Sequence, residues 1–400
     1  MRMTALLVAG ALVSAAAGGP AANEARRPRP EAWPNGLDRD AAYFPIAVWL
    51  QSPQNAARYR AAGINLYVGL WEGPTEAQLD ALRAAPMRVI CEQNAVGLAH
   101  RNDRTIAGWM HGDEPDNAQP MRDPKTGEQT WGPCVPPPRI VEDYRRLRAA
   151  DPTRPILLNL GQGVANDRWV GRGAGASLSD YRTYVEGSDI VSFDVYPIAG
   201  LGKESGPDLM WYIGKGLDRL RDWTGGGKPV WNCIECTAIS GEGRKPTPDE
   251  VASEVWMSLI HGSRGLIYFV HQFAPTFNEH ALLDDPAMLA GVTRVNARIR
   301  RLAPVLNAPT LPDAVTPAPS DPRVPVDVLA KEHGGSLYLF AIGMRNRPTR
   351  ATLTIRERRG LPAEAEVLDE GRRVPIRNGA IRDDFEPYQV HIYRVRLAAR

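Results

Sequence analysis

The sequence has few cysteines and almost no excess of charge of either sign. The balanced charge argues against a nucleic-acid partner. Only four of the 400 residues are cysteine, and 48 basic residues are nearly balanced by 46 acidic ones, so the formal net charge is +2. A nucleic-acid-binding surface normally carries a basic stripe with interleaved aromatic residues, and no such stripe is present. We therefore expect no nucleic-acid partner.

Long apolar runs are also lacking after the first residues, so no later segment is expected to cross a membrane. Residues 1–22 have a basic start, a short apolar segment and small residues around a cleavage-like site. This pattern is typical of a secretory signal peptide, and the Pro- and Arg-rich residues 23–40 are expected to form a disordered linker. We expect a secreted or periplasmic protein with no membrane association in its mature form; a retained N-terminal anchor is the alternative.

The four cysteines do not form the pattern of a metal or redox centre. Cys233 and Cys236 make a C-x-x-C, but there is no second such pair and no histidine pair at ligand spacing. On a strand these two side chains would face opposite sides, so they would bridge poorly. Cys91 and Cys134 are the pair that we expect to be bridged in an oxidising compartment, and four free thiols are the alternative.

Apolar strand-like runs alternate with amphipathic helical segments along most of the chain. The expected strands are 44–51, 64–71, 87–95, 105–115, 155–163, 189–198, 229–237 and 265–273. The expected helices are 52–63, 75–86, 138–152, 208–224, 247–263 and 286–306. Such continuous apolar runs favour a parallel sheet covered by helices, and no glycine-rich phosphate loop follows the first strand. The sequence therefore predicts an α/β fold, a (β/α)8 TIM barrel over residues 41–308.

The remaining residues, 309–400, differ from the barrel region in composition and hydrophobic pattern. A Pro-rich connector is followed by short segments of alternating hydrophobicity, which are separated by GG, NG and EG turn signals. This pattern predicts a small C-terminal antiparallel β-sandwich. No titratable cluster is visible in this region, so we expect it to cap one side of the barrel; sugar binding is the alternative.

In a TIM barrel the chemistry lies at the C-terminal ends of the strands. Here Glu114 follows the fourth predicted strand, and Glu235 follows the seventh. Two carboxylates across a barrel mouth suit glycoside hydrolysis, in which one protonates the leaving oxygen and the other attacks the anomeric carbon or activates water. The alternative is that both residues have structural roles, Glu114 as an acid at the start of a helix and Glu235 as one partner of an ion pair. Further residues near the rim are expected to bind substrate: Asp113, Trp49, Trp71, Asn159, Asn232, Tyr268 and His271.

Three motifs, GDEPD at 112–116, FDVYP at 193–197 and PVWNCIECT at 229–237, resemble the retaining glycosidases of clan A of the glycoside hydrolases. That clan includes cellulases, mannanases and β-galactosidases. The resemblance implies that Glu114 is the acid/base, that Glu235 is the nucleophile and that Tyr196 donates a hydrogen bond to the nucleophile. It implies a retaining β-glycosidase acting on a poly- or oligosaccharide, with no cofactor and no metal, and the expected signal peptide adds that the enzyme is exported. Asp113 stands where the clan usually has an Asn that holds the sugar 2-hydroxyl.

Two other function classes stay open. A metal-dependent barrel hydrolase would use His111, Asp113 and His271, although the His-x-His pair that usually opens such a site is missing. A non-catalytic glycan-binding protein on the same scaffold is the other. The segment 115–138 is too long for a plain connection, so we expect it to wall a substrate subsite; a tolerated insertion is the alternative.

Overall fold

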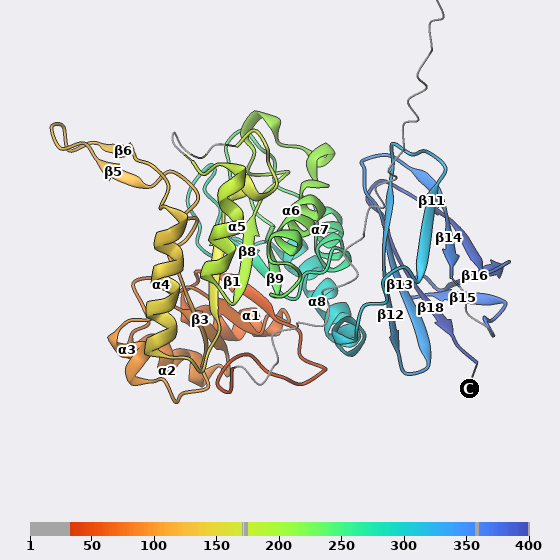
Figure 1. The fold of residues 1–400 in the computed structure, drawn as a ribbon, viewed down its shortest axis with the longest axis horizontal. Helices are drawn as coiled ribbons and strands as arrows, with labels where there is room; N and C mark the ends of the chain where they lie inside the picture. Colours follow the sequence, from red (N-terminus) through yellow and green to blue (C-terminus); the bar gives the residue numbers. More distant parts are fainter. Residues whose placement is uncertain (1–32, 170, 172–174, 357–359, 399–400) are drawn as a thin grey trace, which may run out of the picture.

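The chain folds into a helix-covered barrel and a β-domain that lie side by side (Figure 1). The computed structural model describes residues 33–169, 171, 175–356 and 360–398. The expected signal peptide (1–22) and most of the expected linker (23–40) lie outside the described residues. None of the helices in the described ranges has both the length and the apolar character needed to cross a membrane.

Eight parallel strands close into a barrel in the order β1-β10-β9-β8-β7-β4-β3-β2, which confirms the predicted fold. Trp49, Trp231 and Cys233 belong to a cluster of strand side chains that fills the barrel interior. Because side chains alternate along a strand, the residue between two interior ones on the same strand faces the helices. Each strand lies within one of the apolar runs named above. The strands are β1 (Ile46–Trp49), β2 (Leu66–Val68), β3 (Arg88–Cys91), β4 (Ile106–Met110), β7 (Ile156–Leu160), β8 (Ile190–Asp194), β9 (Val230–Glu235) and β10 (Leu266–Phe269).

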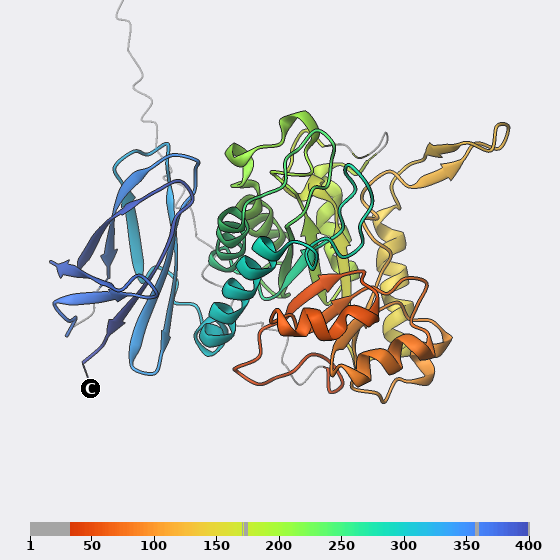
Figure 2. The same cartoon turned by 180° about the vertical axis from the view of Figure 1, so that it is seen from behind.

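Helices cover the outside of the barrel (Figures 1 and 2). Thr75 and Thr247 begin two of them with capping boxes, in which the threonine hydroxyl and a side chain three residues later satisfy free backbone N–H groups. Two helices of five and four residues are too short to show a periodicity, so the sequence does not predict them. The helices are α1 (Ala56–Ala61), α2 (Glu76–Ala84), α3 (Ala95–Ala99), α4 (Pro137–Ala150), α5 (Tyr181–Tyr184), α6 (Tyr212–Trp223), α7 (Pro248–Ile260) and α8 (Pro286–Asn307).

The C-terminal region forms the predicted antiparallel β-sandwich. Its strands pair in the order β11-β14-β17-β16-β15-β18-β13-β12 and enclose an apolar core of their own. The edge strand β11 lies in the expected connector, where its prolines are tolerated because an edge leaves N–H positions unpaired. The strands are β11 (Val315–Pro319), β12 (Val326–His333), β13 (Ser336–Gly343), β14 (Thr349–Ile355), β15 (Glu364–Val367), β16 (Arg372–Arg377), β17 (Ala380–Phe385) and β18 (Val390–Arg396).

The β-domain packs on the side of the barrel that α7 and α8 form. Leu329, Phe340 and Ile342 on β12 and β13 belong to the same hydrophobic cluster as the barrel core. The ring of Trp256 on α7 stacks on Phe340 with 6.0 Å between the ring centroids. A continuous apolar contact of this kind joins the two parts firmly.

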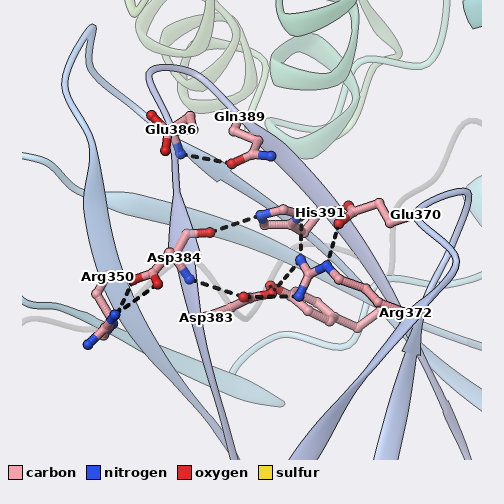
Figure 3. Close-up of polar contacts among 9 residues, drawn as sticks. Arg350, Glu370, Arg372, Asp383, Asp384, Glu386, Gln389 and His391 are labelled. Carbon is pink, nitrogen blue, oxygen red and sulfur yellow. Dashed lines mark hydrogen bonds and ion pairs between the residues drawn. The ribbon is translucent and has the colours of Figure 1, made fainter.

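The β-domain contains a polar cluster that the sequence analysis did not foresee (Figure 3). Arg372 makes two hydrogen bonds to Asp383, at 3.1 and 2.8 Å, and one to Glu370 at 2.7 Å. Nδ1 of His391 lies 2.6 Å from Glu370, and the Tyr393 hydroxyl donates to Asp383 at 2.9 Å. The expectation that this domain has no titratable cluster is therefore wrong. Each acidic side chain in the cluster has a donor, so the cluster holds β16, β17 and β18 together.

Two further expectations meet the structure. Within the segment 115–138, a hairpin of β5 (Pro120–Arg122) and β6 (Gln129–Trp131) projects away from the barrel in both views, so this part of the segment does not wall a subsite (Figures 1 and 2). All four cysteines are free, and the expected bridge between Cys91 and Cys134 is absent. Cys91 is buried on the face of β3 that packs against the helices, whereas Cys134 lies beside Tyr184 of α5.

Candidate active site

Glu114 lies at the C-terminal mouth of the barrel, just after β4. Its N–H donates to the carbonyl oxygen of Asn159 at 3.2 Å, and its own carbonyl accepts from the N–H of Asn117 at 3.1 Å. Its φ angle is 43°, in the left-handed region that non-glycine residues rarely adopt. Such strain persists only where the surroundings enforce it, and it is concentrated at functional sites. The local backbone therefore holds Glu114 in a defined place.

A glycine on the neighbouring strand leaves the space that the Glu114 carboxyl group occupies. Gly161 directly follows β7, and a Cβ atom at this position would lie 2.9 Å from Oε1 of Glu114 and 2.8 Å from Nδ2 of Asn117. A carbon atom does not approach polar atoms this closely without displacing them. Gly161 therefore permits the present position of the Glu114 carboxyl group.

A second carboxylate, Asp113, is held by hydrogen bonds that cross three strands. Nδ2 of Asn159 donates to Oδ1 of Asp113 at 2.9 Å, and Oγ of Ser192 donates to Oδ1 of Asn159 at 2.7 Å. The thiol of Cys233 lies 3.6 Å from the same Asn159 oxygen. Asp113 has access to water at the mouth, but the protein crowds it closely. This desolvation and the charge of Glu114 raise the pKa of Asp113 to about 7.

Asp194, the last residue of β8, completes the group of acids. Its carboxyl group is in hydrogen-bonding contact with that of Glu114, and Asp113 is also close enough to influence it. Oδ1 of Asp194 is buried and receives no hydrogen bond from the described part of the chain. Burial and the charges of Glu114 and Asp113 raise the pKa of Asp194 well above its usual range. A carboxyl group beside other carboxylates resists ionisation, so Asp194 is the acid of this group that keeps its proton well above the usual range.

Asp116 supports the Glu114 turn from within the protein. Its carboxylate accepts hydrogen bonds from the N–H of Gly161, at 2.9 and 3.1 Å, and from the hydroxyl of Tyr181 at 2.8 Å. Burial raises the pKa of Asp116 to about 6, although both donors act in the opposite direction. Asp116 thereby joins the β4 turn to the end of β7 and to α5.

Glu235 is surrounded by a different set of partners. Its two carboxyl oxygens accept hydrogen bonds from the N–H groups of Ile198 at 2.7 Å and Ala199 at 2.6 Å, and the side chain is fully buried. Its other partner is the carboxyl group of Glu254 on α7, whose two oxygens have no donor among the described groups. Burial raises the pKa of Glu235 to about 7 and that of Glu254 well above its usual range.

Tyr196 lies beside the acids of the mouth. The acidic groups that act on it electrostatically are those of Asp194, Glu114 and Asp113. No hydrogen bond between Tyr196 and Glu235 is found within the described residues. The support of a nucleophile that the resemblance implied for Tyr196 therefore does not fit this arrangement, because other donors already satisfy Glu235.

Three of the expected substrate-binding residues lie away from the mouth surface. Asn232 and Tyr268 are fully buried and face the helices, where they bond to Ser258 at 3.0 Å and to Asn296 at 2.8 Å. The physical reason is the alternation of strand side chains, since the neighbouring Trp231 faces the barrel interior. Both assignments are corrected. Trp49 is inside the barrel with only 6% of its surface exposed, so it offers substrate at most an edge.

Of the other expected binding residues, Trp71 is open to water at the rim, whereas His271 and Asn159 are buried near it. Trp71 is 45% exposed, and its ring stacks on the ring of the largely buried His271 with 5.7 Å between centroids. Nε2 of His271 lies 3.0 Å from the carbonyl oxygen of Leu50. Asn159 contacts Asp113 as described above and is 2% exposed, so it orients that carboxylate.

The residues of the metal-dependent alternative do not converge. Nε2 of His111 lies 2.7 Å from the carbonyl oxygen of Gly187, outside the barrel wall, whereas His271 contacts Leu50 across the mouth. Asp113 instead bonds to Asn159. Nowhere in the described ranges do three His, Cys, Asp or Glu side chains form a group that could hold a metal ion.

Asp194, Asp116 and Glu254 are not among the site residues that the sequence predicts. A usable signal existed for Asp194, because it follows Ser192 at the two-residue spacing of the inward face of β8 and stands in the motif FDVYP. The signal for Glu254 is an acid on the buried face of an otherwise apolar helix segment.

Comparison with known proteins shows the fold. No protein-family model matches the chain, and no curated protein matches it in sequence. A variant of the protein AmyP crystallised with maltotriose is similar in structure, with a TM-score of 0.53 and 9% identity over 90% of this chain and 98% of the other. A putative α-galactosidase from Bacteroides fragilis is similar with a TM-score of 0.52 and 10% identity, over 90% of this chain and 80% of the other. This chain thus shares a barrel fold with glycoside hydrolases.

Proposed function

We propose that this protein is a glycoside hydrolase whose proton donor is Glu114. The observation that carries the proposal is the contact between the carboxyl groups of Glu114 and Asp194 at the mouth of the barrel. No ion pair within the described residues involves either of them, so their charge is not neutralised by a neighbouring cation. A carboxyl group with a raised pKa and no cationic partner, such as that of Asp194, is expensive to keep, and such groups are typical of acid–base catalysis.

The pair supplies what hydrolysis of a glycosidic bond requires. In the proposed step, Glu114 passes a proton, which the raised pKa of Asp194 keeps within the pair, to the glycosidic oxygen as the bond from this oxygen to the anomeric carbon breaks. A water molecule adds its hydroxyl group to the carbon and returns its other proton to the pair. The negative charge that remains on the pair stabilises the positive charge of the oxocarbenium-like transition state. Asp113, adjacent to Glu114 and fixed by Asn159, is placed to accept a hydrogen bond from a sugar hydroxyl.

The substrate of the proposed enzyme is a carbohydrate. Among the proteins that share the fold, one was crystallised with maltotriose and another is a putative α-galactosidase, and the motifs of the strand ends resemble those of retaining glycosidases.

We further propose that residues 1–22 direct export and are removed. N-terminal sequencing of secreted protein tests this, and secreted material that begins at Met1 would contradict it.

A double-displacement version of the proposal uses Glu235 as the nucleophile. It requires that substrate binding moves the segment with Ile198 and Ala199, because their N–H groups hold Glu235 inside the protein. The version in which Asp194 is the partner of Glu114 requires no such movement. NMR of the first product separates the two: retained anomeric configuration together with an inactive Glu235→Gln variant supports Glu235, and an active Glu235→Gln variant excludes it.

The test of the function itself is a hydrolysis assay. Purified protein is incubated with nitrophenyl glycosides and neutral polysaccharides, and released nitrophenol and new reducing ends are measured. Glu114→Gln should lower kcat/KM by about 10²–10⁴-fold, the usual contribution of a general acid. Glu128→Gln on the projecting hairpin is the matched control and should retain activity. Binding of glycans without any turnover would favour the non-catalytic alternative and contradict the proposal.

A further inference from the structure

A row of aromatic side chains runs outward from the mouth of the barrel. We define the aromatic ridge as Phe269, His271, Phe273, Phe277 and Trp71. Phe269 and Phe273 have ring centroids 6.1 Å apart, Phe273 and Phe277 5.7 Å, and His271 and Phe277 5.9 Å. His271 in turn stacks on Trp71. The ridge thus connects the loop after β10 with the loop after β2.

The backbone presents the outer part of the ridge in a fixed form. Gln272 and Asn278 exchange two backbone hydrogen bonds, both 2.9 Å long, which close the segment between them and hold Phe273 and Phe277 beside each other. Trp71 is fixed from the side, because its Nε1 donates to the carboxylate of Glu279 at 3.2 Å. A preformed surface binds a ligand without a large loss of conformational entropy.

The outer part of the ridge is open to water. Phe273 is 51% exposed and Phe277 58% exposed, and Trp71 is exposed to a similar degree. Adjacent large aromatic side chains that face water indicate a binding surface more often than chance exposure. Six-membered sugar rings carry C–H groups on their faces and stack on aromatic rings, which are broad and apolar.

The ridge is continuous with the proposed catalytic group. The ring of Tyr196, which lies among the acids of the mouth, is 5.0 Å from the ring of Phe269 at the inner end of the ridge. The ridge itself contains no cationic side chain, since burial lowers the pKa of His271 and keeps its ring neutral at pH 7. Its inner end adjoins carboxylates, which repel anionic ligands.

We propose that the aromatic ridge binds the sugar rings of an uncharged oligo- or polysaccharide chain, of which several units extend from the mouth over Phe273 and Phe277 to Trp71. This inference rests on the proposed glycosidase function, because the chain enters the mouth where it is cut. A substrate with a single sugar ring would leave the outer ridge uncovered. Uronate-containing chains are disfavoured by the acids at the inner end.

The experiment measures how binding depends on the length of the chain. Isothermal titration calorimetry is performed on the Glu114→Gln variant with cello-, xylo-, manno- and malto-oligosaccharides of two and six units, and with hexagalacturonate as the anionic probe. In one neutral series the six-unit sugar should bind at least about tenfold more tightly than the two-unit sugar. Trp71→Ala, and Phe273→Ala with Phe277→Ala, should each remove most of this gain.

Trp131→Ala is the matched control, because Trp131 is 42% exposed but lies on the projecting hairpin. It should leave the gain from chain length unchanged. An equal affinity for two and six units, a gain that the ridge variants do not reduce, or preferred binding of hexagalacturonate would overturn the inference.

Wild-type turnover separates the two proposals. Length-dependent binding that requires the ridge, but no hydrolysis by the wild type, would contradict the glycosidase proposal and leave the ridge as a binding surface. Hydrolysis by the wild type without length-dependent binding would support the glycosidase and contradict the ridge. With both present, the ratio of kcat/KM for six-unit to two-unit substrate should fall by about tenfold in Trp71→Ala.

Discussion

The mouth of the barrel and the polar cluster of the β-domain both contain several acidic side chains, but these acids have different partners. In the β-domain, Arg372 faces Asp383 and Glu370 with hydrogen bonds on each side. At the mouth, Asp194 faces another carboxyl group and has an oxygen without a donor. A carboxylate matched by a guanidinium stabilises the fold, whereas an unmatched one costs stability and persists where chemistry requires it.

The buried pair of Glu235 and Glu254 belongs with the mouth in this comparison. Neither makes an ion pair within the described residues, and both have raised pKa values because of burial. Unlike Asp194, neither Glu235 nor Glu254 has any surface exposed to water. The visible task of the pair is structural, since Glu235 holds the N–H groups of Ile198 and Ala199, which directly follow the loop with Tyr196.

The same change of carboxylate to amide should therefore have opposite effects in the two regions. Asp194→Asn should lower kcat/KM for the substrate that the hydrolysis assay identifies by about 10²–10⁴-fold, because an amide cannot hold the proton that the proposed step uses. Its free energy of unfolding at pH 7 should be equal to or higher than that of the wild type, since a charge conflict is removed. Urea denaturation and steady-state kinetics measure both quantities. An active variant would remove Asp194 from the mechanism.

Asp383→Asn is the counterpart in the β-domain. It leaves Arg372 and Tyr393 without the carboxylate that they share, so the free energy of unfolding should fall by about 2–3 kcal/mol. The protein that remains folded should keep its kcat/KM, because Asp383 lies in the other domain. The comparison fails if this variant is as stable as the wild type or if folded protein loses activity.

Glu254→Gln tests whether the buried pair costs stability. In the wild type, the pKa of Glu235 is raised from its usual 4.5 to about 7. A raised carboxyl pKa means that the folded protein keeps a proton that the unfolded chain releases, so stability falls as the pH rises from about 4.5 to 7. In the variant, the amide donates to Glu235 and lets it ionise.

Glu254→Gln should therefore raise the free energy of unfolding at pH 8 by about 1–3 kcal/mol and leave it nearly unchanged at pH 4. Thermal and urea denaturation across this pH range measure the difference. A variant that is less stable than the wild type at pH 8 would show that the proton is needed for packing and not merely tolerated.

Gly161→Ala tests how the position of Glu114 is maintained. The new methyl group would meet Oε1 of Glu114 at 2.9 Å, and this oxygen is the end of a flexible side chain that can rotate away. The fold should therefore lose little stability, whereas kcat/KM should fall by about tenfold or more, because a displaced proton donor is a poor one. Retention of full activity would show that the carboxyl group need not occupy its present place.

The sequence predicts the features that depend on local patterns, but not those that depend on contacts between segments far apart in the chain. The eight barrel strands follow from continuous apolar runs, and Glu114 follows from its place after one of them. Asn232 and Tyr268 were misplaced because a run that is apolar on both faces does not reveal which residues face inward. The partners of Glu235 could not be predicted, since Ile198 and Glu254 reach it only through the packing of the loop after β8 and of α7.

The smallest expected effect concerns the contact between the two domains. His261 at the end of α7 lies 3.1 Å from Asp218 on α6 and 3.3 Å from Asp327 on β12. Burial lowers the pKa of His261, but the two carboxylates outweigh it and raise the pKa from 6.5 to about 9. A raised histidine pKa contributes stability that is fully present below pH 6.5 and is lost as the pH rises through 9.

His261→Gln should accordingly lower the free energy of unfolding by about 1 kcal/mol at pH 6, because the two aspartates are half exposed and screened by water. The difference from the wild type should shrink between pH 6.5 and 9 and disappear above pH 9, as wild-type His261 loses its proton. Urea denaturation at pH 6, 8 and 10 measures this, with Asp383→Asn as a control whose deficit should not follow the same curve. A difference that stays constant with pH would mean that His261 contributes by packing between the domains and not by its charge.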